Sequence, residues 1–278
     1  MMLLLGCVGT EDPLDSAADT DATVVTEYNL DWSTDPEPLA AASEGTFTIQ
    51  VTDQDGHPID DLQMNHERMV HTMFVSADWT SFSHLHHEDF ADLKVDDIRE
   101  ATFHFPLRLP LAGPYFMMFG YAHANRWLFA EDRMEVGGAP VQASAPDTTA
   151  TDQVVVDDLV VSLTWNSEPL AEYESSWNVH ITEADGTPVE DLVQYLGADA
   201  HCALVNESVT WGSHTHAWFP DMDAMAPGMD MPHLFPGPDV PFAYTFPAGG
   251  NYKMWIQFAR ESTPGRVYEA PFVFKVAG

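Results

Sequence analysis

The sequence predicts an all-β protein made of two tandem immunoglobulin-like β-sandwich domains. Three observations support this prediction: an internal repeat, short alternating segments separated by turn residues, and no long stretch with a capped helical period. Hydrophobic residues make up 45% of the 278 residues, so each half carries enough apolar side chains for a core of its own.

Three segments of the first half recur in the second half. LDWSTDPEPLA (30–40) matches LTWNSEPLA (163–171), FTIQVTDQDGHPIDDL (47–62) matches WNVHITEADGTPVEDL (177–192), and AGPYFMMFGYA (112–122) matches GGNYKMWIQFA (249–259). Residues 139–153 have the small, polar composition of a linker. We therefore expect one sandwich over 24–138 and a second over 154–278, related by an internal duplication.

The repeated segments have the pattern of strands. TFTIQV alternates with period two and leads into the turn cluster DQDGHP, and WNVHIT leads into ADGTP in the same way. YFMMFGYA, YKMWIQFA and APFVFKV are rich in aromatic and β-branched residues, which favour strands.

The first 23 residues predict a signal remnant followed by an acidic tether. Leu4-Leu5-Gly6-Cys7 resembles the lipobox of bacterial lipoproteins, a family in which the cysteine is lipidated after cleavage. This resemblance implies a lipid anchor on Cys7 at the outer membrane or the cell surface of a bacterial envelope. No run of about 18 apolar residues occurs, so membrane contact is expected only through that anchor. Cys202 is then left as a small buried residue without a disulfide partner.

The strongly acidic composition restricts the partners. Forty-four acidic and 10 basic residues give a net charge of −34, which repels nucleic acid and anionic lipid and attracts cations. An acid-rich surface also suits salty surroundings, so charge alone does not name a ligand.

Two segments share the spacing His-x12-His-x-His. They are HTMFVSADWTSFSHLH (71–86) and HCALVNESVTWGSHTH (201–216). If each forms a hairpin centred on Ala77-Asp78 or Glu207-Ser208, His71 lies opposite His84 and His201 opposite His214. Alternation then places the third histidine on the same face. The sequence therefore predicts a three-histidine metal site in each half: His71, His84 and His86; His201, His214 and His216.

Further ligands, or residues that orient the histidines, are expected around these groups. In the same register Met69 lies opposite His86 and Asp199 opposite His216. The loop DMDAMAPGMDMPHLFPG (221–237) adds the soft donors of Met222, Met225, Met229 and Met231, together with His233. Thioethers select Cu(I) and imidazoles suit Cu(II) and Zn(II), so copper is favoured and zinc is the alternative. The methionines could instead fold back as a hydrophobic lid.

Other histidines divide into two sets. His66, His87 and His123 are additional candidates in the first half, whereas His57, His104 and His180 lie in turn or strand patterns and are expected to be structural.

The segments around the histidines resemble a known group of domains. ERMVHTMFVSADWTSFSHLH (67–86) and YLGADAHCALVNESVTWGSHTH (195–216) are similar to secreted bacterial immunoglobulin-like domains with a strand histidine followed by His-x-His-Pro. These domains are grouped near the heavy-metal-associated, FixH/YtkA-like periplasmic proteins. The resemblance implies the same six histidines as motif positions. His87 and Ala217 stand where the pattern has proline, so the loop after each pair is expected to differ.

Three classes of function remain open. The first is a surface- or periplasm-exposed lipoprotein that captures, buffers or delivers a transition metal without catalysis. The second is a non-catalytic surface or adhesive module in which the histidines are structural, with a protein partner that the sequence does not identify. The third is a copper-dependent oxidoreductase, against which the matched histidine groups argue because they predict equivalent sites.

Overall fold

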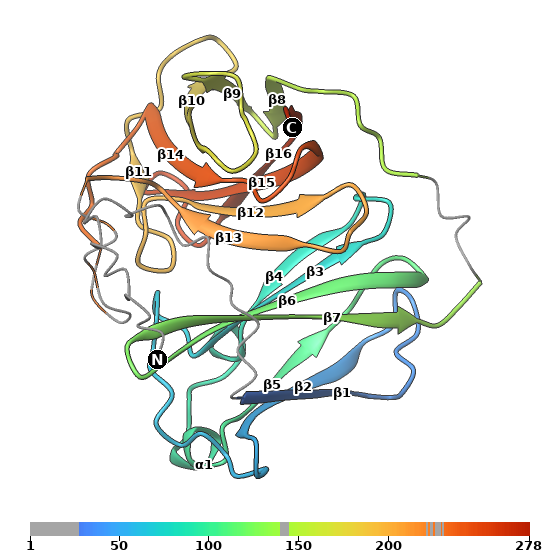
Figure 1. Ribbon diagram of the computed structural model, residues 1–278. Coiled ribbons are helices and arrows are strands. Elements are labelled where there is room, and N and C mark those ends of the chain that lie inside the picture. Colours follow the sequence, from blue (N-terminus) through green and yellow to red (C-terminus); the bar gives the residue numbers. More distant parts are fainter. Residues whose placement is uncertain (1–27, 140–144, 221, 223–224, 226–228, 230) are drawn as a thin grey trace, which may run out of the picture.

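The computed structural model describes residues 28–139, 145–220, 222, 225, 229 and 231–278 (Figure 1). The predicted lipidation site Cys7 and the tether lie outside the described residues.

Residues 28–136 form the first sandwich from two sheets of three and four strands. The outer sheet has the order β1-β2-β5 and the inner sheet the order β4-β3-β6-β7. The bounds are β1 Tyr28–Asp35, β2 Gly45–Asp53, β3 Val70–Ser76, β4 Phe82–Leu85, β5 Thr102–Leu107, β6 Gly113–His123 and β7 Arg126–Val136. A 3-10 turn, η1 (His87–Asp89), and one helix, α1 (Val95–Arg99), connect β4 to β5.

Residues 153–276 form the second sandwich. Its outer sheet has the order β14-β10-β9-β8, and its inner sheet the order β11-β15-β12-β13 with β16 paired to β15. The bounds are β8 Gln153–Val156, β9 Leu159–Trp165, β10 Glu174–Glu183, β11 Leu192–Val193, β12 His201–Asn206, β13 Gly212–His216, β14 Asp239–Thr245, β15 Gly250–Arg260 and β16 Val267–Val276. The all-β, tandem-sandwich prediction is confirmed.

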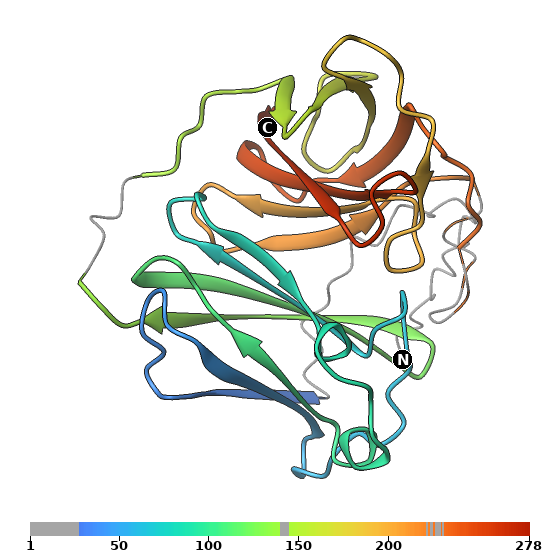
Figure 2. The ribbon, with the colours of Figure 1, turned by 180° about the vertical axis from the view of Figure 1, so that it is seen from behind.

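The two sandwiches stack so that the molecule has four sheet layers, with the inner sheets facing each other (Figures 1 and 2). Alternate residues of an inner strand therefore serve two different cores. On β3, Phe74 packs into the first sandwich, whereas Met73 and Val75 face the second. On β12, Leu204 packs into its own sandwich and Val205 faces the first. All seven residues of β3 are buried, as expected for a strand covered on both faces.

A shared apolar cluster holds the two inner sheets together. It contains Met73, Val75, Trp79, Phe116 and Met118 from the first sandwich, and Ala203, Val205, Val209, Trp255 and Val273 from the second. The ring of Phe82 stacks on that of Trp255 with centroids 4.7 Å apart. Two matching hydrogen bonds flank the cluster: Lys253 Nζ donates to Trp79 O at 2.7 Å, and Arg133 Nη2 donates to Val209 O at 2.8 Å. The equivalent turns at Trp79 and Val209 are therefore each held by a basic side chain of the other sandwich, with donors from the non-equivalent strands β15 and β7.

Among the described residues, no helix is long and apolar enough to cross a membrane.

Candidate metal centre

The histidines lie on two hairpins, and each turn is centred one residue later than predicted, on Asp78-Trp79 and on Ser208-Val209. Asp78 Oδ1 accepts bonds from Ser76 Oγ, Thr80 N and Thr80 Oγ1, and Trp79 takes a φ of 65°. In the second hairpin Asn206 Oδ1 accepts from Thr210 N and Trp211 N. Each turn is closed by a polar side chain and contains a residue with positive φ, Trp79 in the first hairpin and Val209 in the second.

Because the turn centre lies one residue later, the residue opposite each histidine changes by two positions. Thr72 lies opposite Leu85 and Met73 opposite His84, whereas His201 lies opposite His216. The predicted pairs His71–His84 and His201–His214 are therefore wrong. The prediction of a shared face still holds, because a shift of two residues leaves every side chain on its original side.

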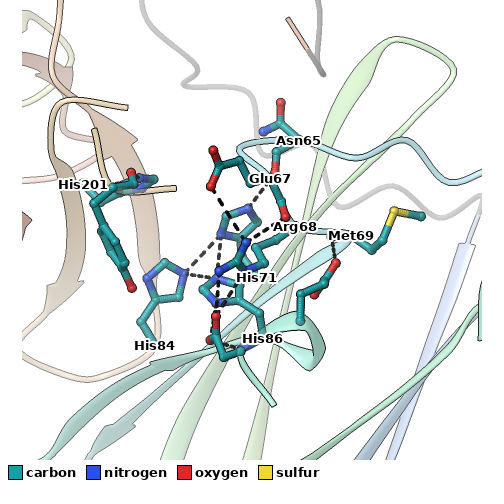
Figure 3. Close-up of polar contacts among 11 residues, drawn as sticks. Asn65, Glu67, Arg68, Met69, His71, His84, His86 and His201 are labelled. Carbon is teal, nitrogen blue, oxygen red and sulfur yellow. Dashed lines mark hydrogen bonds and ion pairs between the residues drawn. The ribbon is translucent and has the colours of Figure 1, made fainter. Parts of the chain in front are cut away.

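In the first group, three ring nitrogens converge. His71 Nδ1 lies 3.2 Å from His84 Nε2 and 3.1 Å from His86 Nε2, and the last two nitrogens are 3.0 Å apart. All three side chains are buried, with exposed fractions between 0% and 7%. Figure 3 shows the rings converging from β3 and from the end of β4, with His201 on the strand opposite.

The second nitrogen of each ring faces an oxygen atom. His71 Nε2 donates to Asn65 O at 3.1 Å, His84 Nδ1 to Gln257 Oε1 at 2.9 Å, and His86 Nδ1 to Asp89 Oδ2 at 2.8 Å. Because these oxygens only accept, the rings carry their protons on the outer nitrogens. The three inner nitrogens are then unprotonated, with lone pairs directed at one another.

The surroundings fix this protonation. Gln257 Nε2 donates to Glu269 Oε2 at 3.2 Å, which orients the amide so that its oxygen meets His84. Arg68 Nη2 lies 2.9 Å from Asp89 Oδ1 and holds that carboxylate against His86. A carboxylate on the outer nitrogen of a histidine is the arrangement that orients metal-binding imidazoles.

Burial keeps these histidines neutral. Desolvation lowers the pKa of His84 to about 4, and desolvation together with the charges of the neighbouring rings lowers the pKa of His71 well below its usual value. The pKa of His86 is lowered for the same reasons. Neutral imidazoles have the lone pairs that a metal ion needs.

The donor set fits a transition-metal ion. Two nitrogens bound to one ion at about 2.0–2.1 Å with tetrahedral angles are about 3.3 Å apart, close to the observed 3.0–3.2 Å. Protons alone do not satisfy this arrangement, because none of the three inner nitrogens has one to donate.

The second group repeats the convergence with fewer supporting bonds. His201 Nδ1 lies 3.2 Å from His214 Nε2, and one nitrogen of each of His201, His214 and His216 lies within 4.8 Å of the others. His201 Nε2 donates to Tyr195 O at 2.7 Å. Two buried nitrogens, His214 Nδ1 and His216 Nε2, have no hydrogen-bond partner among the described residues.

Met69 does not join the first group. Its side chain packs in the core of the first sandwich and points away from the histidines in Figure 3. The register explains this, because the pairing of Met73 with His84 places His71, and not Met69, opposite His86.

Asp199 anchors a loop instead of facing His216. Asp199 Oδ2 accepts from Leu234 N and Phe235 N at 2.8 Å, and its other oxygen bonds His233 Nδ1. Asp199 and His233 thus satisfy each other away from the three-histidine group.

The described methionines of the 221–237 loop behave as the hydrophobic alternative expected. Met231 is buried with Ala198 and Phe219, and Met222 and Met225 pack against this small cluster. Met229 is 55% exposed. These contacts are apolar, so the sequence argument that favoured copper over zinc loses its structural basis.

The remaining candidates are engaged elsewhere. His87 Nδ1 accepts from His104 N, and His123 bonds Tyr28 and Asp61. The three histidines expected to be structural, His57, His104 and His180, bond Asp53, Thr48 and Asp239. Asp53, Asp55 and His57 also lie close enough to share an ion, but in a largely exposed turn where Asp53 already accepts two backbone bonds.

Sequence reasoning missed the residues that orient the rings. Asn65 and Tyr195 each precede the first histidine of their group by six residues, and each begins a turn with two left-handed residues: His66 and Glu67, Leu196 and Gly197. The equal spacing was a usable signal. Asp89 and Gln257 had no such signal in the sequence, because Asp89 is positioned by η1 and Gln257 lies on β15 of the facing sandwich.

The chain belongs to a family described as a domain of unknown function, DUF8832. The family model matches twice, over residues 22–138 and 153–278. The likeness to heavy-metal-associated periplasmic domains stays a resemblance of motifs. A comparison with curated proteins finds no match.

Several solved structures are similar over most of this chain at low identity. The Escherichia coli adhesin FdeC is 10% identical, covering 90% of this chain and 64% of that one, with a TM-score of 0.26. Trypsin-activated alpha-2-macroglobulin from Escherichia coli is 9% identical, with coverages of 91% and 16% and a TM-score of 0.28. The Yersinia pseudotuberculosis adhesin InvE is 11% identical, with coverages of 90% and 59% and a TM-score of 0.25. This chain spans less than two thirds of each, and likenesses this weak carry no functional argument.

Proposed function

We propose that this protein binds transition-metal ions, one in each three-histidine group, without catalysing a reaction. The observation that carries the proposal is the set of three inner nitrogens 3.0–3.2 Å apart, each on a ring whose other nitrogen donates to an oxygen. A cation relieves the repulsion between such lone pairs.

The burial of the groups favours retention of the ion over turnover. Sites that hold a metal for structure or storage are closed, whereas catalytic sites keep a position open to substrate. The six histidines are 0–7% exposed, so an ion bound by them would have little contact with solvent. Capture or buffering fits this closure better than an oxidoreductase does.

The metal we propose to test first is copper, with zinc as the alternative. Nitrogen donors bind Cu²⁺ more tightly than other divalent first-row ions, and imidazole suits both metals. We further propose, from the lipobox-like run ending at Cys7, that the protein is anchored in the bacterial envelope, where it would meet such ions.

The test is metal content and calorimetry on the purified full chain. Wild-type protein stripped of metal should take up two equivalents of Cu²⁺ or Zn²⁺. His84→Ala/His86→Ala and His214→Ala/His216→Ala should each take up one, and a matched double variant of outlying histidines, His57→Ala/His180→Ala, should keep two. Circular dichroism and thermal unfolding establish that each variant is folded.

The alternative is a surface or adhesive module with structural histidines. That protein would take up no metal after stripping, and the triad variants would lose stability without any change in metal content. Absence of uptake by folded wild-type protein would exclude the metal-binding proposal.

A further inference from the structure

The two three-histidine groups come from different sandwiches but lie next to each other. His71 alternates with Met73 on β3 and His201 with Ala203 on β12, so both groups are on the faces of the inner sheets where the two sandwiches meet. The ring of His84 lies 5.0 Å from that of His214 and 6.2 Å from that of His201, centroid to centroid. The ring of His71 lies 5.6 Å from that of His214.

Each half also supports the group of the other half. His84 of the first group donates to Gln257 on β15 of the second sandwich. His66, in the turn before β3, places its ring 3.9 Å from that of His216 and 5.8 Å from that of His201. The facing turns pack together, since a Cβ on Gly197 would lie 3.6 Å from His66 Cα.

From these contacts we infer that the two groups form one composite centre, in which two metal ions are held side by side between the sandwiches. The inference rests on the proposed function. It adds that both ions lie within one buried cluster of seven histidines from the two halves, and that neither half provides the full surroundings of its own ion.

The distance between the ions is bounded by the ring positions. An ion bonded to a ring nitrogen lies about 3 Å from the ring centroid, so ions on His84 and His214 are separated by no more than about 11 Å. Two Cu²⁺ ions at that separation have a magnetic dipole interaction large enough to broaden an electron paramagnetic resonance spectrum.

Proximity also makes the two binding steps unequal. Imidazole binds a metal ion as the neutral ring, so six histidine ligands offset none of the charge of two divalent ions, and each ion repels the other across a low-dielectric interface. The first ion should bind more tightly than the second, and each group should bind its ion more tightly when the other group is removed.

The experiment uses electron paramagnetic resonance on the full chain loaded with Cu²⁺. We expect a dipolar-broadened spectrum at two equivalents, and narrow spectra from His84→Ala/His86→Ala and from His214→Ala/His216→Ala at one equivalent each. A second comparison needs no variant: wild-type protein loaded with one part Cu²⁺ and nine parts Zn²⁺ contains mostly isolated copper and should lose the broadening.

The outcomes separate the two claims. A doubly loaded spectrum equal to that of the zinc-diluted protein would overturn the composite centre while leaving metal binding intact. Uptake of a single ion by wild-type protein would also overturn the pair. No uptake at all would overturn the proposed function itself.

Discussion

Gln257 is the residue through which the second sandwich orients a ligand of the first. Its oxygen accepts the His84 Nδ1 proton, and its amide is held by Glu269. Gln257→Leu removes the acceptor, so His84 can turn and change its protonated nitrogen. Loss of such a partner lowers metal affinity by about 10–100-fold.

We therefore expect Gln257→Leu to weaken the first site by that factor and to leave the second site largely unchanged. Calorimetry in the His214→Ala/His216→Ala and His84→Ala/His86→Ala backgrounds measures the two sites separately. Gln50→Leu is the matched control, since Gln50 lies on β2 of the outer sheet and its amide donates to Glu100 O. Equal affinities for Gln257→Leu and wild type would show that Gln257 does not orient His84.

The same comparison predicts that the two groups differ in affinity. All three outer nitrogens of the first group donate to oxygens, whereas in the second group the outer nitrogen of His214, Nδ1, is buried without a partner among the described residues. The register explains the difference: Gln257 lies opposite His201, and the equivalent residue opposite His71 is Gly120, whose missing side chain leaves room for Trp127. The first site alone should bind Cu²⁺ about 10-fold or more tightly than the second alone.

The raised pKa of Glu269 leads us to expect a pH dependence of stability that comes from the titration of Glu269 itself. Burial raises the pKa of Glu269 from 4.5 to about 7, with the Gln257 bond opposing the shift. The folded chain therefore keeps a proton that the unfolded chain releases between pH 4.5 and pH 7. Stability from this group is fully present below pH 4.5 and is lost as the pH rises through about 7.

Glu269→Gln removes this loss. Its free energy of unfolding, relative to wild type, should rise by at most about 3 kcal/mol between pH 4.5 and pH 8. Urea unfolding of metal-free protein at the two pH values measures the change, with the exposed Glu261→Gln as control. A difference between variant and wild type that does not vary with pH would contradict the assignment.

At the scale of elements, the hairpins show what the sequence could predict. The face shared by the three histidines follows from alternation alone, which a register error of two residues does not disturb. The opposed pairs depend on where the turn is centred, and the bonds of Asp78 and Asn206 accompany a turn centred one residue later than predicted. Met69 and Asp199 were assigned by the same register and were wrong for the same reason.

What covers the histidine face was not predictable from alternation. The segment VHTMFVS is buried along its whole length, and such a run is compatible with a strand covered on both sides. That pattern indicates a covering layer without identifying it. The composite centre depends on the second sandwich supplying that layer, which required the arrangement of the sheets.

Gly212 shows how closely the two inner sheets approach. A Cβ there would lie 2.1 Å from Met118 Sδ and 2.9 Å from Leu204 O. Gly212 N also donates to Glu131 Oε1 of the first sandwich at 2.9 Å. We expect Gly212→Ala to lower the free energy of unfolding by about 1–3 kcal/mol, because the buried Met118 and the strand backbone must move.

Thermal and urea unfolding measure this cost. Gly56→Ala is unsuitable as a control because Gly56 has a positive φ, so Ser213→Ala on the same strand serves instead. An unchanged free energy of unfolding in Gly212→Ala would show that the two inner sheets accommodate the added methyl group without loss of stability.

At the scale of the whole molecule, duplication produces an interface between two copies of one surface. The equivalent turn carbonyls of Trp79 and Val209 each accept from a basic side chain of the other half. An isologous surface brings equivalent groups near its axis, so histidines placed there by duplication meet their own copies. The duplication is visible in the sequence, but the contact between the two histidine groups is visible only in the packing of the sandwiches.

This arrangement predicts that the halves can be uncoupled without removing either group. Val205 is fully buried in the shared apolar cluster, and Val205→Asp places an unpaired charge between the sheets. Each sandwich keeps its own core and its own three histidines, so the variant should still take up two Cu²⁺ ions. The dipolar broadening should fall or disappear, and the hydrodynamic radius should increase.

Val155→Asp is the matched control, because Val155 on β8 of the outer sheet is 70% exposed and does not belong to the shared apolar cluster. It should keep both the broadening and the compact radius. If Val205→Asp instead lost both ions while each sandwich stayed folded, the three histidines of one hairpin would not bind an ion without the other sandwich. If it kept the full broadening, packing of the apolar cluster would not be what brings the ions together.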